Sequence, residues 1–262
     1  MASKSSTDKD GIWETIKTVV YALLIAGLFR TLFFQPFWIP SGSMKETLLI
    51  GDFLFVNKMA YGYSSYSCPF GLCPFSGRIL GSAPERGDIV VFRHPVTGAD
   101  FIKRVIGLPG DRVQMRDGLV VLNGEPLPQE PAGTFEEVFE RQGPLGQFPR
   151  CANAPVGEGG ICEKELLRET LPDGRSYNVL NIGDSFSDNT SAFVVPDEHF
   201  FFIGDNRDNS QDSRSPQSAG GVGFVPFENL IGRANHVVFS SAGRSMLYFW
   251  TWRSDRFFVR LE

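Results

Sequence analysis

An apolar run near the amino terminus restricts the fold of this chain more than any other feature. The twelve residues 18–29 (TVVYALLIAGLF) carry no charge, Arg30 follows, and a second apolar run begins directly behind it. Twelve helical residues reach only about 18 Å, short of the ~30 Å hydrocarbon core of a bilayer. Counting on through Arg30 to Ile39 gives 22 residues, which is enough to span, and Trp38 then lies where an interfacial aromatic belt is expected. The pattern favours an uncleaved transmembrane anchor over residues 16–38.

Two other interpretations of this run remain open. A cleaved signal peptide would fit Lys9 and Lys17 ahead of a short apolar segment. The first small-x-small pair, however, is Ser41-x-Ser43, more than ten residues past Phe29. A buried core helix would explain the first twelve residues and would leave the second apolar run unexplained.

The charges around the run favour one orientation. Three lysines precede it, whereas Arg30 and Lys45 are the basic residues near its far end. Because loops on the cytoplasmic side carry an excess of basic residues, the amino terminus is expected in the cytoplasm. The expected organisation is a cytoplasmic tail at 1–15, the anchor, and an extracytoplasmic body at 39–262.

The body is predicted to be mainly antiparallel β. The chain contains 24 Phe, 28 Gly and 17 Pro, a mixture that favours short strands broken by turns. Asp117-Gly118 lies between two apolar runs and predicts a tight hairpin turn. Short apolar or β-branched runs predict strands at 88–94, 101–108, 112–116, 119–122, 200–203 and 236–240. The formal charge of −5 lacks the basic excess of a nucleic-acid-binding protein, so no nucleic-acid partner is expected.

Two stretches rich in Gly, Pro and Ser, near 62–84 and 125–200, predict loop insertions on this β core. Each contains two cysteines. The local pairs are Cys68 with Cys73 and Cys151 with Cys162. Disulfides are the expected state outside the cytoplasm, and the local pairings are the simplest of the three possible connectivities. One zinc ion held by four thiolates, or free buried thiols, remain alternatives.

A serine and a lysine are the candidates for catalysis. Ser43 directly follows the apolar run, although a Ser-Gly-Ser segment is more often a flexible loop. Lys103 and Arg104 are neighbours on a predicted strand, so they point to opposite faces and one cation must enter an apolar surface. A lysine tolerates this by losing its proton, and a neutral buried lysine is a general base, whereas arginine stays charged. The alternative is a strand end at which both cations reach water.

Histidine and calcium chemistry fit less well. His94 precedes Pro95 in a turn, and nothing places the other two histidines beside Ser43. The acidic string 204–214 offers oxygen ligands but lacks the glycine and the glutamate of an EF-hand loop. A turn network in which Asp and Arg side chains pair is the better account, and neither a metal nor a cofactor is expected.

Five sequence blocks follow one another in a fixed order behind the anchor. They are PSGSMK at 40–45, GDFLFVNK at 51–58, RGDIVVF at 86–92, DFIKRVIGLPGD at 100–111 and GDNRDNSQDSR at 204–214. Together they resemble bacterial type I signal peptidases, the membrane-bound leader peptidases that remove signal peptides from exported proteins. The resemblance runs from the anchor to about residue 240. It departs at Glu46, where the family motif usually has proline, and this bears on the rigidity of the loop that carries Ser43.

The resemblance implies a catalytic arrangement. Ser43 would be the nucleophile and Lys103 the general base that takes its proton. The Ser43 amide and the Ser41 hydroxyl would hold the oxyanion, and Ser210 would hydrogen-bond and orient the lysine amine. Four residues would brace the last block without touching substrate: Asp205, Arg207, Asp212 and Arg214. Substrates of the family carry small residues, commonly Ala-x-Ala, before the cut. The residues that match the walls of two shallow apolar pockets are Ile39, Met44, Leu48, Phe101 and Ile102.

The resemblance also implies a fold and a location. The fold would be a β-rich serine protease domain of the kind shared with LexA-type repressor proteases. One helix would anchor it in the bacterial inner (plasma) membrane, with the catalytic domain on the periplasmic side. The expected partners are signal-peptide-bearing preproteins and membrane lipid, and a monomer is expected. Beyond the part of the chain that carries the resemblance, aromatic residues interleaved with arginines at 249–260 predict an interfacial patch, with a strand that packs them into the core as the alternative.

Two other functions remain as alternatives. One is a non-enzymatic, membrane-anchored β-domain that only binds exported chains. The other is a LexA-like self-cleaving protease, although the chain has an anchor and no basic helix-turn-helix.

Overall fold

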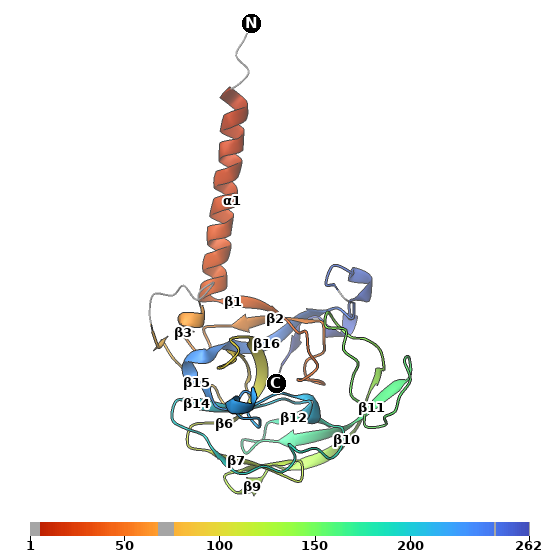
Figure 1. Ribbon diagram of the computed structural model, residues 1–262. Helices are drawn as coiled ribbons and strands as arrows, with labels where there is room; N and C mark the ends of the chain where they lie inside the picture. Colours follow the sequence, from red (N-terminus) through yellow and green to blue (C-terminus); the bar gives the residue numbers. More distant parts are fainter. Residues whose placement is uncertain (1–5, 68–75, 244, 262) are drawn as a thin grey trace.

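A single long helix stands out from a β-rich body in the computed structural model, which describes residues 6–67, 76–243 and 245–261 (Figure 1). Helix α1 (Ser6–Leu32) has a 22-residue apolar section, Gly11–Leu32, none of which is buried against the body. At 1.5 Å per residue this section is about 33 Å long, close to the ~30 Å hydrocarbon thickness of a bilayer. The helix is therefore long and apolar enough to cross a membrane.

The helix ends earlier than the expected 16–38 span. Strand β1 (Phe34–Trp38) follows α1 at once and pairs antiparallel with β2 (Asp52–Asn57). Pro36 lies within β1, and proline can neither donate a helical hydrogen bond nor fit against the preceding turn, whereas an edge strand accepts it. Residues 34–38 thus belong to the sheet, and the helix reaches back to Ser6.

The largest sheet runs in the order β1-β2-β16-β5-β6-β14-β15, with β17 also pairing with β16. All of these pairings are antiparallel. The strands not yet bounded are β5 (Ile89–Arg93), β6 (Asp100–Gly107), β14 (His199–Ile203), β15 (Val225–Pro226), β16 (Leu230–Ser240) and β17 (Val259–Arg260). Strand β16 joins the two halves, because one part pairs with β2 and the other with β5. This arrangement places β1 and β6, which carry the residues around the site, in one continuous sheet.

Smaller sheets complete the body. Strands β7 (Arg112–Arg116) and β8 (Leu119–Leu122) form the predicted hairpin, with positive φ at both Asp117 and Gly118, as a tight primed turn requires. Strands β13 (Phe193–Val194) and β9 (Glu125–Pro126) flank this hairpin, and β3 (Tyr63–Ser64) pairs with β4 (Arg78–Ile79). Short 3₁₀ turns lie at Ser65–Ser67, Arg207–Asn209, Gln217–Ala219, Phe227–Asn229, Phe249–Thr251 and Ser254–Arg256.

The expected loop insertion at 125–200 is largely wrong. It contains a three-stranded antiparallel sheet made of β10 (Gln129–Val138), β11 (Ile161–Thr170) and β12 (Ser176–Asn181). Strand β11 alternates exposed and buried residues at its start, but its exposed positions include Glu163 and Glu165 and it buries Lys164, and Glu and Lys are poor strand formers. A register shift between Pro131 and Gly133 further obscures the pattern in β10. Of the other insertion, 62–84, the two short strands β3 and β4 are described, and the expected Cys68–Cys73 pair lies outside the described residues.

The expectation of a mainly antiparallel β fold with one apolar helix at the amino terminus is confirmed. Two clusters of buried apolar side chains support the region around β1, β5 and β6. One includes Ile39, Met44, Leu48 and Ile89, and the other includes Val90, Phe92, Val105 and Phe202. These clusters support the turn that carries Ser43 and the strand that carries Lys103.

Candidate active site

Ser43 and Lys103 meet at the wall of a cavity. Ser43 lies in the turn that follows β1, and Lys103 lies on β6. The Lys103 Nζ is 2.7 Å from the Ser43 Oγ and 2.8 Å from the Ile102 carbonyl oxygen. Both side chains are buried, with 3% of Lys103 and 9% of Ser43 exposed. A serine hydroxyl and a lysine amine at this distance can exchange a proton directly.

Lys103 and the adjacent Arg104 are both buried, on opposite faces of β6. The alternative of a strand end at which both cations reach water is wrong. Arg104 makes a two-pronged ion pair with Asp205, at 2.9 and 2.8 Å, and its guanidinium lies 3.9 Å from the centre of the Tyr177 ring. Lys103 makes no ion pair among the described residues. The arginine is therefore neutralised by a partner, and the lysine is not.

Burial lowers the pKa of Lys103 from 10.5 to about 8, and the more distant charges of Asp212 and Asp205 oppose part of this effect. At pH 7 a lysine with a pKa of 10.5 is unprotonated in about one molecule in 3,000, whereas a pKa of about 8 leaves about one in ten unprotonated. The low-polarity surroundings thus supply a usable base near neutral pH.

The turn that carries Ser43 is held by a residue the sequence reasoning did not single out. The Asn206 backbone amide donates to the Ser43 carbonyl at 3.1 Å, and its side-chain amide donates to the Gly42 carbonyl at 2.8 Å. The close approach of this turn to the 204–214 block also explains Gly204, since a Cβ at that position would lie 2.6 Å from the Ser43 carbonyl oxygen. Both residues lie in the 204–214 block, so this sequence block is the feature from which they could have been identified.

Groups suited to hold an oxyanion lie beside the nucleophile. The Ser43 amide donates to no acceptor among the described residues, and Ser41 lines the same cavity. An uncommitted amide at this point can bind the negative oxygen that forms when a hydroxyl attacks a carbonyl.

The cavity has a volume of about 670 Å³. Three of the five predicted pocket residues, Ile39, Phe101 and Ile102, line it. Met44 and Leu48 do not line it; they are fully buried in the apolar cluster behind the turn. Two residues that the sequence reasoning did not assign to the pocket, Phe37 and Trp38 of β1, line the cavity instead.

The four predicted bracing residues lie behind the cavity and none of them lines it. Asp212 pairs with Arg214 within the block, and Asp205 pairs with Arg104 as described above. Arg207 pairs outside the block, with Glu169 of β11 at 2.6 Å. Burial alone would raise the pKa of Asp212, but the Arg214 guanidinium and a backbone hydrogen bond from Gly204 outweigh it and hold that pKa below its usual range. The block is thus braced partly by itself and partly by strands β6 and β11.

Ser210 does not make the expected hydrogen bond to the Lys103 amine in this structure. Ser210 lines the cavity, but its hydroxyl is buried and has no hydrogen-bond partner of standard geometry, although it lies close enough to Asp212 to help lower the pKa of that carboxyl. The three histidines do not line the cavity, and the His94 Nδ1 accepts hydrogen bonds from the Val96 and Thr97 amides of its own turn.

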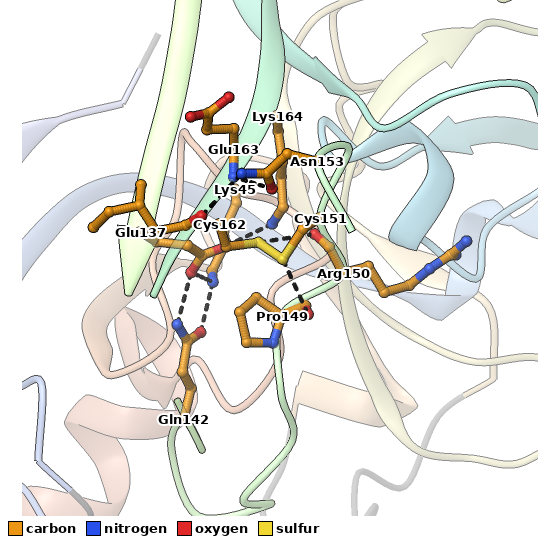
Figure 2. The surroundings of a disulfide bond; sticks show 11 residues. Lys45, Glu137, Gln142, Pro149, Arg150, Cys151, Asn153, Cys162, Glu163 and Lys164 are labelled. Carbon is orange, nitrogen blue, oxygen red and sulfur yellow. Dashed lines mark hydrogen bonds and ion pairs between the residues drawn. A yellow bond between two sulfur atoms is a disulfide. The ribbon is translucent and has the colours of Figure 1, made fainter. Parts of the chain in front are cut away.

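The segment between β10 and β11 also reaches the cavity, which sequence reasoning missed. Leu145, Gln147 and Arg150 line its wall, and the next residue, Cys151, forms a disulfide with Cys162 (Figure 2). The expected Cys151–Cys162 pair is therefore present. It fastens the end of the wall segment to β11.

Comparisons with known proteins identify the family of this chain. The family model described as "Signal peptidase, peptidase S26" matches residues 12–239. The chain is 40% identical to the signal peptidase I of Rickettsia typhi over 239 residues, covering 87% of this chain and 80% of the relative. It is 40% identical to that of Rickettsia massiliae over 250 residues, covering 91% and 84%.

This chain belongs to the signal peptidase I family. A crystal structure of a signal peptidase I from Enterococcus faecalis is 25% identical and covers 58% of this chain and 97% of that chain, with a TM-score of 0.30. The matched residues 12–239 include all but the first residue of the apolar section of α1, together with Ser43, Lys103 and the 204–214 block. The expected membership of the type I signal peptidases is confirmed.

Proposed function

We propose that this signal peptidase cleaves preproteins with Ser43 as nucleophile and Lys103 as general base. Family membership supports a membrane-anchored serine endopeptidase that removes amino-terminal signal peptides from exported preproteins. The observation that supports the two roles is the 2.7 Å contact between the Lys103 amine and the Ser43 hydroxyl at the cavity wall. Asn206, which binds the turn but touches neither reacting atom, would act as a positioning residue.

The proposed reaction has two halves. Neutral Lys103 takes the Ser43 proton as the oxygen attacks the carbonyl carbon of the last signal-peptide residue, and the Ser43 amide with the Ser41 hydroxyl binds the resulting oxyanion. The lysine ammonium then protonates the leaving amine, which departs as the new amino terminus and leaves an ester on Ser43. In the second half Lys103 takes a proton from water, the hydroxide attacks the ester, and the proton returns to Ser43.

Strand β6 offers an edge for an extended substrate. Residues 100–103 pair with β5 on one side, whereas β14 pairs only with residues from Arg104 onward. The other side of residues 100–103 lies at the cavity, so an extended peptide can add to the sheet there and present its carbonyl to Ser43. The apolar lining from Phe37, Ile39 and Ile102 suits small apolar side chains before the cut. Ser210 lines the same cavity and makes no hydrogen bond of standard geometry, so its hydroxyl would be available to bind the lysine amine.

We place the body on the extracytoplasmic side of the bacterial inner membrane, as a monomer, with lipid as a second contact. The disulfide is consistent with an oxidising compartment. A carboxy-terminal segment exposes Leu247, Phe249, Trp250 and Phe258, each at least 68% accessible. In Figure 1 this segment lies level with the end of α1 that joins the body. Aromatic side chains at that level would contact the bilayer surface. Packing of these aromatics into the core, the alternative from the sequence, does not hold for Phe249, Trp250 and Phe258.

Cleavage of a purified preprotein by added enzyme tests the proposed function. The wild-type chain should release the mature protein, and Ser43→Ala and Lys103→Ala should each lose nearly all turnover. Lys103→Arg should also be inactive, because guanidinium does not give up its proton. A binding domain would cleave nothing, and a self-cleaving protease would cut its own chain rather than the added preprotein. Substantial turnover by Lys103→Arg would refute the assignment of the base.

A further inference from the structure

Lys45, two residues after the nucleophile, is a buried cation that the proposed reaction does not use. Only 4% of it is exposed, and its side chain reaches a carboxylate of the three-stranded sheet. Its Nζ donates to the Glu137 carboxylate of β10 and, at 2.6 Å, to the Gln142 side-chain oxygen (Figure 2). Among the described residues of the nucleophile turn, Lys45 is thus the one that makes a hydrogen bond to β10.

The acceptor of this contact is itself held in place. The second Glu137 oxygen accepts from Lys164 of β11 at 2.6 Å, and the Gln142 side-chain amide donates to the same carboxylate at 2.7 Å. Lys164 stands two residues after Cys162, and the disulfide fixes the segment that carries Gln142 at its far end. Two lysines therefore converge on one carboxylate, on a framework built by β10, β11 and the disulfide.

The Lys45 side chain is also packed against the backbone of the catalytic turn. A Cβ placed on Gly42 would lie 3.2 Å from the Lys45 Cε and 3.3 Å from its Cδ. Gly42 separates the two serines, Ser41 and Ser43. A displacement of the Lys45 stem would therefore be transmitted to the nucleophile and to the oxyanion donors.

A second polar contact ties the same turn to the same sheet. The Glu46 carboxylate accepts from the Asn178 side-chain amide of β12 at 3.0 Å. The loop that lacks the family's usual proline at this position is thus held by two side-chain contacts, from Lys45 to β10 and from Glu46 to β12.

We propose that Lys45 is a positioning residue, which keeps Ser43 within reach of Lys103 by fastening the catalytic turn to Glu137. The inference rests on the Ser43 and Lys103 roles proposed above. A purely structural ion pair would contribute to folding and leave turnover per folded molecule unchanged. A positioning contact would instead affect kcat, because a 1 Å misplacement of reacting groups can cost about a hundredfold in rate.

Lys164 provides a matched control for the test. It pairs with the same Glu137 carboxylate and is also buried, but it comes from β11 and, among the described residues, makes no hydrogen bond or ion pair with the catalytic turn. Lys45→Met and Lys164→Met each remove one buried cation from the same carboxylate. Only Lys45→Met also breaks the link between that carboxylate and the catalytic turn.

The experiment measures kcat and KM for a signal-sequence peptide with the full-length chain in detergent micelles, together with unfolding by urea. Lys45→Met should lower kcat by about a hundredfold and leave KM within about twofold. Lys164→Met should lose comparable stability and keep kcat within a few fold. Lys45→Arg should recover most of the rate, because a guanidinium can pair with the same carboxylate.

Equal kcat losses in the two methionine variants, or a normal kcat in Lys45→Met, would overturn the inference. If Lys45→Met does not fold, Glu137→Gln replaces it, since this variant keeps the shape of the site and weakens the contact to the turn. Ser43→Ala separates the two proposals. An active Ser43→Ala chain would refute the proposed function itself, whereas an inactive one alongside a fully active Lys45→Met would refute only the positioning role.

Discussion

Replacing Lys103 with methionine should abolish turnover and at the same time stabilise the fold at neutral pH. The lysine is buried, and its pKa in the folded protein is about 8 against 10.5 in an unfolded chain. At 1.36 kcal/mol for each factor of ten, holding the protonated amine in the fold costs roughly 3 kcal/mol. Methionine has a similar length and no charge, so it removes this cost. It also removes the hydrogen bonds to Ser43 and Ile102, worth about 1 kcal/mol each.

The sign of the effect depends on pH. Because the folded-state pKa is lowered, the cost is complete below pH 8, shrinks as pH rises from 8 to 10.5, and is absent above 10.5, where the amine is neutral in both states. The methionine variant should therefore be more stable than wild type by about 1 kcal/mol at pH 7. It should be less stable by about 2 kcal/mol above pH 10.5, where only the removal of the two hydrogen bonds counts.

Urea unfolding of the full-length chain in micelles, followed at pH 7 and pH 10.5, measures this change. Ser43→Ala is the control, because it keeps the lysine and should show a stability difference from wild type that varies much less with pH. The decisive quantity is the change of roughly 3 kcal/mol between the two pH values, rather than either single difference. A Lys103→Met difference that is the same at both pH values would show that the amine is not desolvated as described.

Three further outcomes are expected. The rate of peptide cleavage should rise about tenfold per pH unit below pH 8 and level off above it, following the pKa of Lys103; a profile that levels near pH 6 would point to another base. Deleting residues 2–32 should leave a folded, active body. Deleting residues 2–38 should greatly reduce activity, because it also removes β1 and part of the cavity wall. Equal activity of the two shortened proteins would contradict this. Gly204→Ala should lose activity by at least tenfold, because the added methyl group meets the Ser43 carbonyl; a fully active variant would refute the tight packing.

Local sequence patterns predicted the strands whose apolar residues alternate or run together. Strands β5, β6, β7, β8 and β14 lie where these patterns placed them, because burial in the apolar core of the body demands apolar side chains. The sheet of β10, β11 and β12 was missed because β10 is exposed along much of its length, and the exposed positions of β10 and β11 carry several Glu residues and an Arg. Such strands are stabilised by pairing with one another, and no local property of their sequence reports that pairing.

The candidate site was predictable to the extent that its residues lie in short blocks. Ser43 and Lys103 are 60 residues apart, and alternation on a strand could show only that Lys103 or Arg104 must be buried. The resemblance to a family supplied the pairing. Partners that lie outside the blocks, such as Glu137 and Glu169, could not be found in this way, since their contacts depend on how a separate sheet docks against the catalytic turn.

Adjacent residues of β6 solve the problem of a buried positive charge in two different ways. Arg104 cannot lose its proton at accessible pH, so its burial requires a partner, and Asp205 supplies one with two hydrogen bonds. Lys103 can lose its proton, and its amine meets a hydroxyl and a carbonyl instead of a carboxylate. A carboxylate in contact with Lys103 would stabilise the charged form and raise its pKa, and so remove the base. The 204–214 block meets both requirements at once, because it directs Asp205 to the arginine and turns Asp212 toward Arg214, away from contact with the lysine.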